Sequence, residues 1–174
     1  MGGATASTHR VRAYRTWICR LGALVALTQA VAAQPAQGDR KGGPTPSAPG
    51  AAVYFIDIKD GSILPRKPMI RFGLRNMGVA PAGFDKANTG HHHLLIDAPL
   101  RSPDERIPND FNHLHFGLGQ TEAQVTLPLG THTLQLVLAD ADHVPHVPPV
   151  MSETIKVLVT RNGRRPRVAR HRDR

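Results

Sequence analysis

Apolar and polar residues alternate in short segments through the middle of the chain. The clearest segment is 132–139, in which Leu134, Leu136 and Leu138 fall on one face of an extended strand. Six segments are predicted as strands by this pattern or by their content of β-branched and aromatic residues: 53–58, 69–74, 92–97, 125–127, 132–139 and 151–160. No segment shows sustained helical periodicity. The pattern predicts an all-β fold, an immunoglobulin-like β-sandwich of about seven strands.

The connections between these segments are rich in Gly and Pro, which indicates long loops at 78–90 and 99–110. The segment 139–149 follows the clearest strand and contains Asp140, Asp142, His143 and His146 among several prolines. Its prolines exclude a helix, so we expect a loop here. Such a loop either carries function on a rigid scaffold or is simply a stiff turn in which aspartate side chains cap the backbone.

The first 33 residues have a different pattern from the rest of the chain. Arg10, Arg12 and Arg15 precede an apolar run that starts at Leu21 and ends in the small residues of 31–33. This is the layout of a secretory signal peptide, and the run is shorter than the roughly 20 residues that a spanning helix needs. We therefore expect cleavage after Ala33 and a periplasmic or extracellular location. Cleavage would remove Cys19, the only cysteine, so any metal must be bound by His, Asp or Glu.

The remaining chain divides into three predicted parts. Residues 34–50 are a flexible Pro/Gly-rich linker, 51–160 are the His-rich β-sandwich domain, and 161–174 are a disordered Arg-rich tail. The formal net charge is +9, yet the part 51–160 contains nine Lys/Arg and eleven Asp/Glu. A nucleic-acid-binding domain would carry its basic charge on its body, so nucleic acid is not expected as a partner. The basic tail indicates at most a weak electrostatic contact with an anionic membrane, and no protein partner is indicated.

Histidines are the main candidate chemistry. Of the ten in the chain, eight lie between 91 and 146. In a strand, residues two apart share a face, so the pair His91 and His93 and the pair His113 and His115 each point one way. Two such pairs on adjacent strands can present imidazoles to a single ion. The predicted metal ligands are His91, His93, His113, His115, His143, His146 and Asp142.

Two histidines have a different expected role. His92 shares its face with Leu94 and Ile96, so it should turn inward, and His132 shares its face with Leu134 and should lie at the edge of the core. A set of imidazoles and carboxylates without thiolates is the donor mix of divalent copper or zinc. Asp140 and Asp142 are candidate ligands or acceptors that fix a histidine tautomer.

Several sequence motifs resemble those of a known family. They are GHHHLLID at 90–97, HLHFG at 113–117, GQTE at 119–122 and LQLVLAD at 134–140. With these motifs the chain resembles the secreted domain-of-unknown-function family numbered 4399, over about 53–159. The resemblance implies a fold and export, and it assigns no activity.

A weaker resemblance is to periplasmic copper-carrier domains with an immunoglobulin-like fold. It rests on the Pro128-Leu129-Gly130 turn, the loop from Asp140 to His143 and the last strand. It implies a sandwich with a metal-binding loop. The chain departs from the carriers at Gln34, where a carrier would begin with a copper-binding histidine.

The residues show no catalytic motif, because there is no nucleophile elbow, no phosphate loop and no His-Glu-x-x-His. The prediction is an exported binding protein for copper or zinc without catalysis. Two alternatives stay open at this point. One is a metal-free extracytoplasmic interaction module, whose histidines would scatter over separate faces. The other is a small metal-dependent β-barrel enzyme, whose ion would keep an open position for water or substrate.

Overall fold

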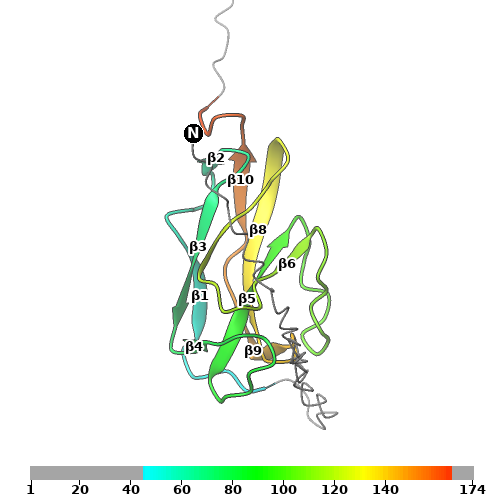
Figure 1. The fold of residues 1–174 in the computed structure, drawn as a ribbon. Helices are drawn as coiled ribbons and strands as arrows, with labels where there is room; N and C mark the ends of the chain where they lie inside the picture. Colours follow the sequence, from blue (N-terminus) through cyan, green and yellow to red (C-terminus); the bar gives the residue numbers. More distant parts are fainter. Residues whose placement is uncertain (1–44, 166–174) are drawn as a thin grey trace, which may run out of the picture. The chain divides into compact units, whose positions relative to one another are not determined.

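The computed structural model describes residues 45–165, and the predicted signal peptide lies outside them. These residues form an all-β domain of two sheets (Figure 1). The strands are β1 (Ala52–Ile56), β2 (Ile63–Leu64), β3 (Met69–Arg75), β4 (Gly78–Val79), β5 (Thr89–Ile96), β6 (His113–His115), β7 (Glu122–Gln124), β8 (Gly130–Ala139), β9 (Pro145–Met151) and β10 (Ile155–Val159). Within the described part of the chain, no helical segment has the length and apolar character needed to cross a membrane.

The smaller sheet has the order β1-β3-β7, and all its pairs are antiparallel. The larger sheet has the order β2-β10-β8-β5-β4, with β6 paired to β5 and β9 paired to β8. Ile70 and Phe72 of the smaller sheet pack with Leu94, Leu134 and Leu136 of the larger one in a single buried cluster. This confirms the all-β class and is consistent with a β-sandwich. The immunoglobulin-like topology stays a prediction.

The strands differ from the sequence prediction in two places. The predicted strand at 125–127 is wrong by a few residues, since β7 ends at Gln124 and Val125 only donates a backbone hydrogen bond to Pro68. The expected loop at 139–149 is shorter than predicted, because β9 begins at Pro145. Pro148 and Pro149 lie in this strand, and the ladder to β8 has an irregularity between Leu138 and Ala139.

Residues 45–50, placed by sequence in the linker, run beside β9. Pro46 forms a β-bridge with Val147. Ser47 N donates to the carbonyl of Val147, and Val147 N donates to the carbonyl of Thr45. This contact places Thr45 beside the start of β9, where its Oγ1 lies 2.9 Å from Nδ1 of His146.

The strand β5 is buried on both faces. His92, Leu94 and Ile96 point to the core between the sheets, whereas Leu95 points to the outer face. There Leu95 packs with Ile107 of the loop 97–112, so this loop covers part of the outer face of the larger sheet. The candidate site lies on this covered outer face.

Candidate metal centre

Three histidines of the site are placed by the ladder of two neighbouring strands. In the antiparallel pair of β5 and β6, His93 lies directly opposite His115, and His91 is two residues further along β5 on the same face. The ring centroids of His91 and His93 are each within 5.0 Å of that of His115. The two His-x-His segments thus lie on adjacent strands, the arrangement in which such pairs can present imidazoles to a single ion.

His143 reaches the same place from the loop after β8. Because β8 ends at Ala139 opposite His91, the loop starts beside the other imidazoles. Asp140 shapes it: its Oδ1 accepts hydrogen bonds from the backbone N–H groups of Asp142 and Val144 at 2.9 and 3.0 Å. His143 has a φ of 69°, a left-handed conformation that costs a non-glycine residue about 1 kcal/mol or more. Such strain is typical of positions where a side chain must point at a functional site.

Two further contacts, which the sequence analysis missed, hold this loop against the loop 97–112. Arg106 Nε donates to the carbonyl of Asp142 at 2.6 Å, and Ile107 N donates to the carbonyl of His143 at 2.9 Å. Neither contact has a signal in the sequence, because both are made to backbone atoms of a distant loop.

Gly117 is a second residue whose role the sequence analysis missed. A Cβ at this position would lie 2.2 Å from Cε1 of His115, so only glycine leaves room for the ring in this position. The glycine is visible in the HLHFG motif, yet the close approach that requires it appears only in the fold.

Four imidazoles meet at this point: His91, His93, His115 and His143. Each offers one ring nitrogen, and the four nitrogens lie within 4.8 Å of one another. His93 Nε2 is 3.0 Å from His91 Nε2, which is 3.3 Å from His143 Nδ1. A tetrahedral zinc ion with bonds of roughly 2.0–2.1 Å separates its ligand nitrogens by about 3.3 Å. The two shorter spacings are close to this value, and the group could hold a metal ion.

Hydrogen bonds among neutral imidazoles cannot satisfy this arrangement. A ring nitrogen carries either one hydrogen or one lone pair, so His91 Nε2 can form a hydrogen bond with only one of its two nitrogen neighbours. His115 Nε2 is buried without any hydrogen-bond partner. Buried polar atoms without partners are costly and uncommon in proteins. A cation would accept a lone pair from each ring at once.

The surroundings keep these imidazoles neutral. Burial, together with the neighbouring His143 and His115, lowers the pKa of His91 to about 3. Burial and the other rings lower the pKa of His93 to about 2. Burial also lowers the pKa of His115 and of His143. Neutral imidazole is the form that binds a metal ion, so the lone pairs are available at neutral pH.

Three other predicted ligands lie outside this group of four. His113 is buried on β6, but its Nδ1 contacts Asp110 Oδ1 at 2.8 Å. His146 Nδ1 is 2.9 Å from Thr45 Oγ1 instead. Asp142 lies in the loop beside His143, and its carbonyl accepts the hydrogen bond from Arg106. The structure thus brings together four of the seven residues that the sequence suggested, and the other three lie outside the group.

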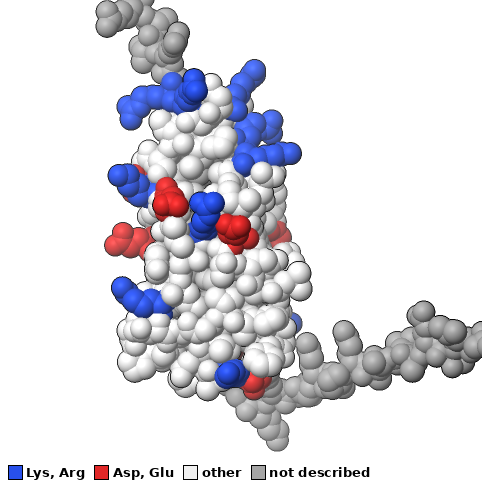
Figure 2. All heavy atoms as spheres, turned by 60° about the vertical axis from the view of Figure 1, so that its left-hand side comes forward, with Lys and Arg blue, Asp and Glu red and all other residues white. Residues whose placement is uncertain are grey.

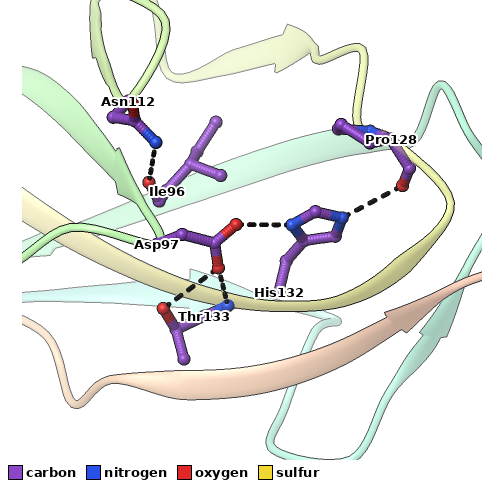
Figure 3. A network of polar contacts seen from close by, with 6 residues as sticks. All are labelled: Ile96, Asp97, Asn112, Pro128, His132 and Thr133. Carbon is purple, nitrogen blue, oxygen red and sulfur yellow. Dashed lines mark hydrogen bonds and ion pairs between the residues drawn. The ribbon is translucent and has the colours of Figure 1, made fainter.

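Two other histidines, His92 and His132, have different surroundings. His92 points into the core as predicted, and its ring lies 5.2 Å from that of Phe72. His132 is held at both nitrogens: Nδ1 is 2.6 Å from Asp97 Oδ2 and Nε2 is 3.1 Å from the carbonyl of Pro128 (Figure 3). Both nitrogens have partners, so His132 needs no ion.

The fold and the site define an all-β protein whose larger sheet carries a buried cluster of four imidazoles that can hold a metal ion. The sequence model of a domain of unknown function, DUF4399, matches residues 70–160, so the chain belongs to that family. The match includes all four histidines of the cluster. Comparison with curated proteins and with solved structures gives no match, and the likeness to copper carriers receives no support from them.

Proposed function

We propose that this protein is an exported binding protein for divalent copper or zinc and that it has no catalytic activity. The observation that carries the proposal is the meeting of four ring nitrogens, from His91, His93, His115 and His143, within 4.8 Å. Imidazole is a good ligand for both metals, and the site offers no sulfur that would favour monovalent copper.

Nearby carboxylates support a divalent ion without occupying the ligand positions. Asp140 is buried, and both it and Asp142 act electrostatically on His143. A dication among four neutral rings would gain from these negative charges, since the interaction of charges is strengthened in a buried place.

The donor count supports binding over catalysis. Zinc in structural sites has four protein ligands, whereas catalytic zinc has three and keeps a position for water or substrate. Four imidazoles on one ion fill a tetrahedral set. His91 and His93 are also fully buried, which restricts access from one side of the site.

Export is proposed from the sequence alone. The arginines before Leu21, the apolar run and the small residues ending at Ala33 support a signal peptide, with the mature chain starting at Gln34. Determining the N-terminus of the protein recovered from the periplasm or the medium tests this step.

The metal itself is tested by elemental analysis of the untagged protein, followed by titration with copper and zinc after treatment with a chelator. We expect close to one ion per chain. The binding should raise stability by about 4 kcal/mol when free metal is a thousandfold above the dissociation constant. The matched control is His113→Ala together with His146→Ala, which removes two histidines outside the group of four and should leave the stoichiometry unchanged.

Two results would favour the two alternative functions, the interaction module and the metal-dependent enzyme. If neither metal binds nor shifts the melting temperature, the protein is better described as a metal-free interaction module. If metal binds and spectroscopy of a cobalt-substituted form shows an exchangeable water on the ion, the site has an open position and the enzyme reading gains support.

A further inference from the structure

Five basic residues lie at the end of the domain opposite the start of β5. Arg66 and Lys67 follow β2, and Arg161, Arg164 and Arg165 follow β10. The strands β2 and β10 are parallel neighbours, with Val159 beside Leu64, so the two segments leave the sheet at the same end. Thr160 N donates to the carbonyl of Leu64 at 2.9 Å and ties the segments together. Figure 2 shows Lys and Arg side chains gathered at one end, with the acidic side chains in view mostly nearer the middle.

These residues are exposed and have no acidic partner within residues 45–165. Among the ion pairs formed within residues 45–165, none includes any of the five. By contrast, Arg71 on β3 is paired with both Asp57 and Glu122. Pro65, Arg66, Lys67 and Arg161 line an open hollow of about 560 Å³. Concentrated positive charge without internal partners is suited to bind phosphate groups.

The same end presents an apolar side chain. Leu129 lies in the turn that precedes β8, and the first residue of β8, Gly130, pairs with Val159 at the end of β10. Leu129 is 48% exposed. Basic residues around an exposed leucine are typical of surfaces that bind the interface of a bilayer. A surface for single-stranded nucleic acid would instead offer aromatic rings for stacking, and 65–67, 128–130 and 161–165 contain none.

We propose that this basic end, made of Arg66, Lys67, Arg161, Arg164, Arg165 and Leu129, docks on membranes that contain anionic phospholipid. The sequence adds Arg167, Arg170, Arg172 and Arg174 directly after it. The strand β8 runs from this end to Ala139, which lies opposite His91, a distance of about 30 Å for its ten residues. A docked domain therefore holds the four-histidine cluster away from the lipid surface. The proposal does not depend on metal binding.

The test is sedimentation of the full-length protein with vesicles, either of phosphatidylcholine alone or of phosphatidylcholine with about one third phosphatidylglycerol. The neutral vesicles measure any binding by the apolar N-terminal segment, which all variants share. Arg66→Glu with Lys67→Glu should weaken binding to the anionic vesicles by at least about tenfold, because each basic side chain near the surface contributes to attraction. The matched control is Arg75→Glu with Lys86→Glu, an equal change of charge at exposed positions elsewhere, and should cost less than about threefold.

A second measurement separates lipid from other polyanions. In Leu129→Trp, the added indole should shift its emission to the blue with anionic vesicles, relative to the parent chain with its single Trp17, and should not shift with double-stranded DNA. Equal losses in both pairs of charge reversals would overturn the proposal, because net charge alone would then explain binding. Binding to DNA with no binding to vesicles would also overturn it. Thermal melts of all four proteins show whether each variant is folded.

Discussion

His132 and the cluster of four histidines have opposite surroundings. His132 contacts a carboxylate at one nitrogen and a carbonyl at the other (Figure 3). His91, His93, His115 and His143 have mainly one another as neighbours, and several of their nitrogens have no partner. A histidine whose two nitrogens are held by oxygens is part of the structure. A group of neutral rings that point their nitrogens at one another can donate several lone pairs to one cation.

Removing lone pairs from the four-histidine cluster should have the largest effect. In His91→Ala with His93→Ala, two of the four ring nitrogens are lost, and metal affinity should fall by about a thousandfold or more, since four such ligands together supply on the order of 10 kcal/mol. The measurement is competition titration against a chelator of known affinity. His132→Ala serves as control and should keep one ion per chain. Equal loss in the two proteins would remove the distinction between the groups.

Acid should have the next largest effect, a loss of stability of the metal-free protein. The pKa values of His91 (about 3), His92 (about 4) and His93 (about 2) are all lowered in the folded state from 6.5. Below pH 6.5 the unfolded chain binds more protons at these sites, so stability falls as pH falls. At pH 5 each of the three contributes a loss of about 2 kcal/mol at most.

Urea unfolding of the metal-free protein at pH 7, 6 and 5 measures this loss. The variant His91→Ala with His93→Ala lacks two of the three groups, so its stability should depend less steeply on pH. A wild-type stability that is constant between pH 7 and 5 would show that the rings are not buried in the neutral form.

The contrast between the groups was partly visible in the sequence. Alternation in strands predicted that His91 and His93 share a face and that His92 turns inward. The register was not predictable, because nothing local determines that His115 faces His93. Placing His113 opposite Leu95 instead of among the other rings is a consequence of that register.

The loop residues show the limit more sharply. Spacing put His143 and His146 three residues apart and made both candidates. The fold separates them, because β9 starts at Pro145 and His146 contacts Thr45, which is 101 positions away in the chain. A contact over such a separation has no signature in either segment. The family and the all-β class could be recognised from motifs and alternation, since both depend on local sequence.

The smallest effect is expected for a change at His132. His132→Ala removes the contact between His132 Nδ1 and Asp97 Oδ2 and leaves that carboxylate with its bonds from Thr133. Burial of Asp97 raises its pKa, but the hydrogen bonds from His132 and Thr133 outweigh this and lower it, so the carboxylate is ionised at neutral pH. A hydrogen bond to a charged group contributes about 1.5–3 kcal/mol, and the exposure of Asp97 places the expected loss near the lower value. Chemical denaturation at pH 7 measures the loss, and Asp97→Asn should show a similar one. If His132→Ala is as stable as the wild type but loses metal, His132 belongs with the four-histidine cluster and the distinction drawn from its hydrogen-bond partners is wrong.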